Sequence, residues 1–349
     1  MTAGNKRATI IEIARLANTS TATVSRVLSG ADYPVSETLR NAVKQAAKEV
    51  GYVPNAFGQS LKNGKTKDIG VIIPNFTNPF YMQMLSGIET MCREHGYNPM
   101  ICSSNNAEDL ELMNIELLRK KCVEGLIISS FHKSPLEIRS ALSMHKHVVL
   151  FDQESSLSGC DYVTFDFEQG GYTALSYLLS KGHRHIAFLT APLENRGSRR
   201  ALYRGCQRAI REFADSARCD LVVEDIHVDD YTRWEYENGR QLAERVLEMN
   251  ERPTAVFVYN DMTAIGVMSQ LMKEGLRIPE DISVIGFDNI VMAEFANPPL
   301  TTICQPAFET GSLAAQAIID KIEGRRFASC RINLDPQLIE RDSVSILQN

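Results

Sequence analysis

Apolar residues recur along the chain with two different periods. From residue 9 to 63 they follow helical spacing, as in Ile10, Ile13 and Ala17, with no alternation of β-branched residues. From residue 69 onward, short runs rich in β-branched residues alternate with helical stretches. The sequence therefore predicts a small N-terminal bundle of helices followed by a larger body of alternating strands and helices.

Seven apolar runs in the body predict strands. They are apolar on both faces, which is typical of parallel strands covered by helices on both sides. The expected class is therefore doubly wound α/β, and the series of βα units is too long for one ordinary sheet, which favours two similar open sheets with a ligand cleft between them. The predicted strands are 69–73, 98–103, 125–130, 147–151, 185–190, 254–258 and 282–287.

Charge is divided unevenly between the two parts. The whole chain has a net charge of -6, but residues 1–65 hold nine Lys/Arg against four Asp/Glu, and the remainder is net -11. A basic head on an acidic body suggests that the head binds a polyanion. The polar residues 63–68 between the two periods predict a linker and the domain boundary.

Composition excludes several classes. Hydrophobic residues make up 44% and charged residues 23%, as in globular proteins. No apolar run approaches the roughly 18 residues that cross a bilayer, and the polar N-terminus does not resemble a signal peptide, so we expect a cytoplasmic protein. The eight cysteines show no metal-ligand spacing, so we predict reduced thiols, no metal site and no cofactor.

The strongest local signal lies in residues 9–30. A first amphipathic helix ends at Asn18, which tolerates the left-handed conformation, and Ser20 is suited to cap a second helix. The three polar residues between the helices match the turn of a helix-turn-helix motif. Two ordinary amphipathic helices remain the alternative, because this motif is loose.

In a helix-turn-helix, the second helix enters the major groove by its N-terminus. Arg26 is suited to bind a guanine with two hydrogen bonds, whereas Thr21 and Ala22 offer a hydroxyl and a methyl group to base edges. Hydroxyl side chains nearby are suited to phosphate oxygens. The candidate DNA-binding residues of the head are Thr9, Ser20, Thr21, Ala22, Thr23, Ser25 and Arg26.

The chain resembles the lactose-repressor/galactose-repressor (LacI/GalR) family of transcription regulators over nearly its whole length. The resemblance is carried, in order, by TSTATVSRVLSG, VSETLRNAVKQAAKEVGYVPNAFGQSLKNGKT, IGVIIPNFTNPFYMQMLSGIE, VEGLIISS, KGHRHIAFL, the segment 253–289 and PPLTTICQP. It implies a helix-turn-helix head, a hinge helix that forms on operator DNA, a periplasmic-binding-protein-like effector domain and a homodimer. The implied domains are 1–54, 55–67 and 68–349, the last divided into 68–165 with 296–325 and 166–295 with 326–349.

The resemblance also implies a role for the segment NAFGQSL. In the family, a leucine of the hinge helix enters the minor groove, and here that residue is Leu61, with Asn55, Ala56 and Gln59 on the same element. An apolar wedge of this kind bends the duplex by unstacking one base step. A plain linker remains the alternative, because Gly58 is a poor helix former.

The resemblance also implies effector-binding residues in the body, at positions that match the family's motifs. Most of them follow predicted strands. Carboxylates and amides at the carboxyl ends of strands suit hydroxyl-rich ligands, and an aromatic side chain can stack on a sugar face. A helix N-cap is the alternative role for Asp152, Asn260 and Asp288. The candidates are Asn75, Phe80, Asp152, Arg196, Ser198, Trp234, Asn260, Asp261 and Asp288.

The chain departs from the family pattern at two places. Many members have an arginine three residues before the glycine that is Gly205 here, but this chain has Leu202, with Arg199 and Arg200 upstream. The aromatic side chain of the cleft is either Tyr231 or Trp234, and the spacing to Gly239 favours Trp234. We therefore leave open which arginine, if either, replaces the missing one.

Other functional classes fit less well. The stretch GQSLKNGKT has the wrong glycine spacing for a nucleotide P-loop, and the strand follows it instead of preceding it, so an enzyme is not expected. A sugar-binding protein of the transport type would share the body but lack the head. We expect a repressor that binds operator DNA as a homodimer and is controlled by a small polar metabolite, a sugar or sugar derivative, without contact to a membrane.

Overall fold

The computed structural model of the chain forms two compact units, Met1–Thr66 and Lys67–Asn349, here called the head and the body. It describes residues 8–29, 34–52, 66–129, 135–151, 159–213, 217–226 and 231–347. The predicted hinge residues Asn55, Ala56, Gln59 and Leu61 and the predicted cleft residue Asp152 lie outside the described residues.

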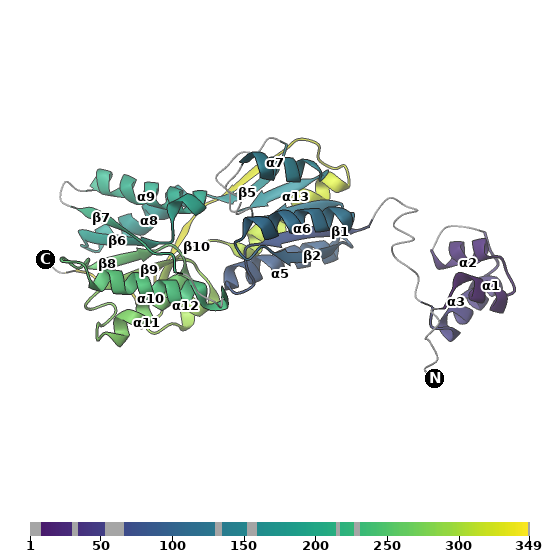
Figure 1. The fold of residues 1–349 in the computed structure, drawn as a ribbon, viewed down its shortest axis with the longest axis horizontal. Coiled ribbons are helices and arrows are strands. Elements are labelled where there is room, and N and C mark those ends of the chain that lie inside the picture. Colours follow the sequence, from purple (N-terminus) through teal and green to yellow (C-terminus); the bar gives the residue numbers. More distant parts are fainter. Residues whose placement is uncertain are drawn as a thin grey trace. The chain divides into compact units, whose positions relative to one another are not determined.

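The head contains the helices α1 (Ile10–Leu16), α2 (Thr21–Leu28) and α3 (Glu37–Glu49) (Figure 1). Ser20 caps α2, because its Oγ accepts a hydrogen bond from the backbone N–H of Thr23 at 3.1 Å. Asn18 has a φ of 45°, the left-handed conformation that follows α1. The predicted helix end and the predicted cap are both confirmed.

Side chains from the three helices meet in one small core. Ile13 of α1, Val24 of α2 and Val43 of α3 are completely buried there. Apolar residues recur three or four positions apart on each helix, so each helix turns one apolar stripe to this core. The core therefore determines which side chains of α2 face outward.

The body contains two six-stranded sheets in the described part of the chain. In spatial order, the first has β11 (Arg331–Leu334), β5 (Asp161–Phe165), β4 (Val148–Phe151), β3 (Gly125–Ile128), β1 (Asp68–Ile73) and β2 (Asn98–Ser103). The second has β12 (Gln337–Ile339), β10 (Thr301–Cys304), β9 (Ser283–Asp288), β8 (Ala255–Val258), β6 (His185–Thr190) and β7 (Arg218–Val223). Only the pairing of β10 with β12 is antiparallel among these strands.

Helices cover each sheet and define two subdomains (Figure 1). The first subdomain has α5 (Pro79–Glu94), α6 (Glu108–Lys120), α7 (Pro135–Ser143) and α13 (Ala307–Ile322). The second has α8 (Phe167–Ser180), α9 (Gly197–Phe213), α10 (Trp234–Leu247), α11 (Asp261–Lys273) and α12 (Val291–Phe295), with the 3₁₀ turns η1 (Leu193–Asn195) and η2 (Tyr231–Arg233). All residues of central strands such as β8 and β9 are buried, as expected for strands covered on both faces.

The chain passes between the subdomains three times, from β5 to α8, from β10 to α13 and from β11 to β12. This corrects two predicted boundaries. Residues 301–304 belong to the second sheet, although 296–325 was expected in the first subdomain, and residues 331–334 belong to the first sheet, although 326–349 was expected in the second. Strand pairing decides both cases: β10 pairs with β9, and β11 pairs with β5.

All seven predicted strands are present, and the described part of the chain contains five further strands that were not predicted. Of these, β7 and β11 contain exposed polar residues, and β12 has only three residues, so their patterns are weak. The predicted strands include the central ones, whose burial on both faces produces continuous apolar runs.

Candidate functional site

The outward face of α2 presents the residues that the sequence assigns to base contacts. Thr21, Ala22 and Arg26 are exposed and Ser25 is half-buried. Val24, which lies between them in the sequence, points into the head core and is completely buried. A polar and small-residue surface of this kind, at the N-terminal half of a helix, has the chemistry that major-groove recognition needs.

Three other candidate residues have structural roles at helix starts. Thr9 caps α1, with its Oγ1 accepting from the backbone N–H of Glu12 at 3.4 Å. Ser20 and Thr23 share a hydrogen bond between their hydroxyl oxygens at 2.9 Å. These interactions hold the two helix N-termini, and backbone N–H groups there are suited to phosphate oxygens.

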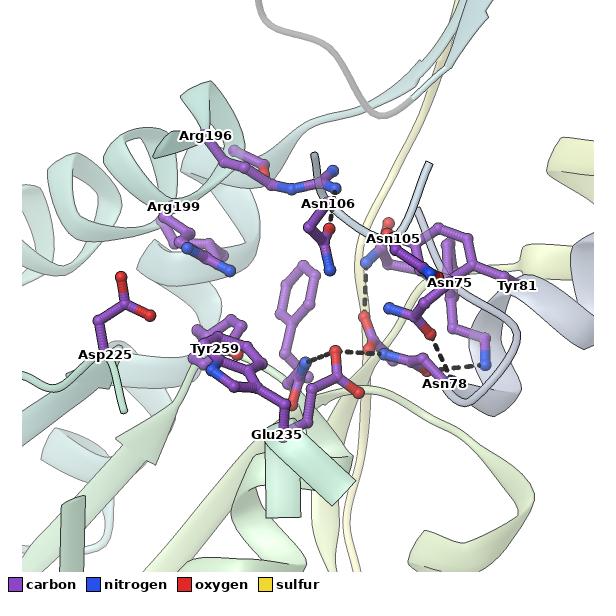
Figure 2. A pocket seen from close by; sticks show the side chains of 18 of the residues that line it. Asn75, Asn78, Tyr81, Asn105, Asn106, Arg196, Arg199, Asp225, Glu235 and Tyr259 are labelled. Carbon is purple, nitrogen blue, oxygen red and sulfur yellow. Dashed lines mark hydrogen bonds between the residues drawn. The ribbon is translucent and has the colours of Figure 1, made fainter. Parts of the chain in front are cut away.

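A cavity of about 570 Å³ lies between the two subdomains (Figure 2). Asn75 and Asn105 follow β1 and β2, and Tyr259 and Asn260 follow β8, so the cavity is at the carboxyl ends of strands, where ligands bind in open α/β sheets. Its other lining residues are Asn78, Phe80, Tyr81, Asn106, Ala107, Leu110, Phe167, Arg196, Ser198, Arg199, Leu202, Asp225, Ile226, Trp234, Glu235, Phe287, Asp288 and Gln305.

Most of the predicted effector residues are in this lining. The structure brings together Asn75, Phe80, Arg196, Ser198, Trp234, Asn260 and Asp288. Trp234 lines the cavity and donates a hydrogen bond from Nε1 to the carbonyl oxygen of Ile226 at 3.0 Å. The side chain of Tyr231, the other aromatic residue considered, lies outside the described part of the structure.

Asp261 does not belong to the cavity lining, and its prediction needs correction. It is completely buried in the second subdomain, where its carboxylate accepts hydrogen bonds from Thr302 Oγ1 at 2.6 Å and from the backbone N–H of Ile290 at 2.9 Å. A Cβ on Gly286 would lie 2.2 Å from its Oδ1, so a glycine there gives the carboxylate room. Burial raises the pKa of Asp261 to about 7.

The alternative role of helix N-cap holds for Asn260 but not for Asp288. Asp288 does not cap α12, whose N-cap is Ile290; it accepts a hydrogen bond from Gln305 Nε2 at 2.7 Å and has a φ of 117°. Such a backbone angle is costly for a residue other than glycine and is found mostly at functional sites. Asn260 does cap α11, with its Oδ1 accepting from the backbone N–H of Thr263 at 2.8 Å.

A half-buried carboxylate, Glu235, accepts hydrogen bonds from residues of both walls, and it is not among the residues that the sequence predicted for the cleft. Its Oε1 accepts from Nδ2 of Asn78 and from Nδ2 of Asn260, each at 3.0 Å (Figure 2). Burial raises the pKa of the Glu235 carboxyl, although the two amides and Arg199 favour the charged form. Asn78 belongs to the first subdomain and Asn260 to the second, so this carboxylate connects them.

Arg196 makes a second connection between the subdomains. Its Nη2 donates to Asn106 Oδ1 at 3.2 Å, and its Nη1 donates to Ser129 Oγ at 3.4 Å. Asn106 and Ser129 follow β2 and β3 of the first sheet. The sequence predicted Arg196 for the cleft but gave no signal for these partners, because nothing in a single sequence states which strand ends become neighbours.

Comparison with known proteins identifies both units. Residues 9–55 match the bacterial regulatory proteins of the lacI family, and residues 175–344 match the periplasmic binding protein-like domain. The chain is 34% identical over 342 residues to the HTH-type transcriptional repressor PurR of Vibrio atlanticus (strain LGP32), covering 97% of this chain and 99% of that repressor. In the part of the chain that the structure describes, no helix has the length and apolar character needed to cross a membrane.

Solved structures show the same architecture. The Lac repressor dimer bound to operator and the anti-inducer ONPF superposes with a TM-score of 0.84 at 25% identity, over 97% of this chain and 100% of that one. A LacI family regulator from Enterococcus faecium with bound ribose gives a TM-score of 0.69 at 30% identity, over 80% of this chain and 100% of that one.

Proposed function

The chain belongs to the lacI family of bacterial regulatory proteins, and on that premise we propose that a small polar metabolite bound in the cavity controls how tightly the head holds its operator. The protein is a DNA-binding transcription regulator, as its repressor relatives are. The proposal assigns the cavity a binding role and no catalytic one. A binding protein without a regulatory role has no support, because residues 9–55 match a regulator family.

One observation carries the proposal: the cavity is closed by hydrogen bonds that run from one subdomain to the other. The amide of Asn78 donates to Glu235, and Arg196 donates to Asn106. A ligand that uses these same groups binds the closed and open arrangements with different affinity, and this difference is what shifts a population. Amides and carboxylates match the hydroxyl groups of a sugar or sugar derivative, and ribose occupies a similar regulator.

The DNA-binding form is proposed to be a homodimer. Each chain has one helix-turn-helix head, and a second head is needed to bind the two halves of a palindromic operator. The Lac repressor, which this chain resembles over 97% of its length, is a dimer on its operator. Selection of binding sites from random duplexes by the full chain is expected to return a palindrome with two half-sites, and an unrelated set of sequences would contradict the proposal.

Substitution of Arg26 tests the recognition surface. Arg26→Ala is expected to cost about 1 to 3 kcal/mol on the selected operator and to relax the preference at one base pair of each half-site. The matched control is Arg15→Ala, which removes an exposed arginine from α1. Binding to operator and to random duplex is measured by fluorescence anisotropy at two salt concentrations. Equal losses on both duplexes for Arg26→Ala would show that Arg26 does not read a base.

A further inference from the structure

Two neighbouring arginines at the start of α9 have different environments. Arg200 is exposed, and its Nη1 donates to the carbonyl oxygens of Leu193 and Glu194 at 3.0 and 3.2 Å. Arg199 is only 9% exposed and lines the cavity. Leu202, one turn further along, is an apolar part of the same lining. Of these three residues, Arg199 alone brings a positive charge to the cavity.

The packing of α9 on α8 determines this difference. A Cβ on Gly205 would lie 2.0 Å from the carbonyl oxygen of Glu168, and one on Gly171 would lie 2.0 Å from that of Leu202, so the two helices touch through glycines. Because helix residues three and seven apart share a face, Arg199 lies on the buried face that contains Leu202 and Cys206. The fold therefore holds Arg199 inward.

The guanidinium of Arg199 has incomplete partners. Its Nη1 donates to the carbonyl oxygen of Pro192 at 3.3 Å, and the ring of Tyr259 covers one face at 4.7 Å. Its buried Nε has no hydrogen-bond partner, and no carboxylate of the described residues forms an ion pair with it. Burial lowers the pKa of Arg199, and the attraction of the Glu235 carboxylate, which forms no ion pair with it, offsets this only in part. A group of opposite charge beside it would remove this cost.

The cavity lining contains two arginines and three carboxylates. Figure 2 shows Arg196 and Arg199 together, extending toward the same space, with Glu235 farther along the wall below Tyr259. Asp225 and Asp288, the latter accepting from Gln305, add two further carboxylates to the lining. A ligand that matches both kinds of charged group needs a negatively charged acceptor for the arginines and hydrogen-bond donors for the carboxylates.

We propose that the effector is a polyhydroxylated molecule with an anionic group, a carboxylate or a phosphate, that binds Arg199. This rests on the proposed function, in which the cavity binds the effector. A neutral oxygen would accept a hydrogen bond from the guanidinium but would add no charge beside it, whereas a charged oxygen would accept and would also supply the direct counter-charge that Glu235 does not give. The cavity volume of about 570 Å³ is in the range of pockets that enclose small ligands. Sugar acids and phosphorylated sugars have this chemistry.

Thermal unfolding of the full chain tests the anion directly, with inorganic phosphate as the probe and sodium chloride at the same ionic strength as the reference. Phosphate is expected to raise the Tm of the wild type and of the control Arg200→Met beyond the effect of chloride. Arg199→Met is expected to lose this phosphate-specific increase, and Arg199→Lys to keep part of it. An equal increase in Arg199→Met, or none in the wild type, would overturn the proposal.

A second measurement separates the two possible anions and protects the test from a folding defect. D-gluconate, D-glucose 6-phosphate and D-glucose are titrated while the emission of Trp234, the one tryptophan of the chain, is recorded. One acid is expected to bind, with an affinity about tenfold lower in Arg199→Met and an intermediate one in Arg199→Lys. Equal binding of D-glucose to wild type and Arg199→Met, without binding of either acid, would sink the anionic group and leave the proposed function standing.

Discussion

The two walls of the cavity differ in the polar groups that they contribute. The described lining residues from the first subdomain are uncharged, and the polar ones are mainly amides: Asn75, Asn78, Asn105 and Asn106. The charged lining residues come from the second subdomain: Arg196, Arg199, Asp225, Glu235 and Asp288. An amide donates with one end and accepts with the other, whereas a charged group has one sign only. We therefore propose that the second wall selects the ligand and that the first wall closes over it.

Removal of the central carboxylate is expected to have the largest effect. Glu235→Ala takes a charged acceptor from the ligand and from both Asn78 and Asn260, so effector affinity is expected to fall by about 2 to 3 kcal/mol, or about 30- to 150-fold. Glu237→Ala is the matched control, because that glutamate pairs with Arg233 and Arg240 outside the cavity lining. The affinity is measured by titration of Trp234 emission.

A contrary outcome would change the comparison between the walls. If Glu235→Ala lowers the melting temperature but leaves effector affinity unchanged, the carboxylate only joins the two subdomains. The charged groups left to contact a ligand would then be the two arginines, Asp225 and Asp288.

Only part of the second wall was predictable from the sequence. The charged residue Asp288 and the amide Asn260 follow strands with clear apolar runs, so their position at the cavity was predictable. Glu235 was not predictable, because it lies in the first turn of a helix that follows a 3₁₀ turn, and no strand signal precedes it. The inward position of Arg199 was predictable, because its spacing to Leu202 and Cys206 places it on the buried face of α9.

For an asparagine side chain, a helix cap and a contact in the cavity do not exclude each other. Asn78 caps α5 with Oδ1, which accepts from the backbone N–H of Phe80 at 2.9 Å, while its Nδ2 donates to Glu235. Asn260 divides its two ends in the same way. An amide can therefore serve the fold and the cavity at once. Asp261 has no donor end when ionised, and both of its oxygens accept from buried protein donors.

The head was more predictable than the body because its signals are local. The end of α1 at Asn18 and the cap of α2 at Ser20 depend on residues within one turn of each other. β10 joins the second sheet by pairing with β9, and β11 joins the first sheet by pairing with β5. β11 and β5 are far apart in the sequence. A single sequence does not contain that pairing as a local pattern.

The protonation state of Asp261 decides whether the second subdomain has a further negative charge outside the cavity lining. Its pKa of about 7 in the folded chain is above the ordinary value, so the folded state binds a proton that the unfolded state releases between about pH 4 and pH 7. Stability is therefore expected to fall as the pH rises through this window, by on the order of 2 kcal/mol between pH 5 and pH 7.

Asp261→Asn is expected to flatten this dependence, because an amide does not titrate and can still accept from the N–H of Ile290. Urea unfolding of both proteins at pH 5 and pH 7 measures the difference, and the contribution of Glu235 cancels because both proteins contain it. An identical pH dependence in the two proteins would mean that Asp261 is ionised throughout and adds a permanent negative charge behind the cavity.

The smallest effect is expected from the amide wall. Asn106→Ala removes the acceptor of Arg196 Nη2 at 3.2 Å, which is expected to weaken closure and to reduce effector affinity by about 1 kcal/mol, or about fivefold. Ser129→Ala is the control on the same guanidinium, because its contact at 3.4 Å is longer and is expected to matter less. If the first wall only closes the cavity, Asn106→Ala lowers the affinities of all ligands by the same factor. Titrations with an anionic ligand and its neutral counterpart measure this, and a change in their ratio would show that the amide wall also selects the ligand.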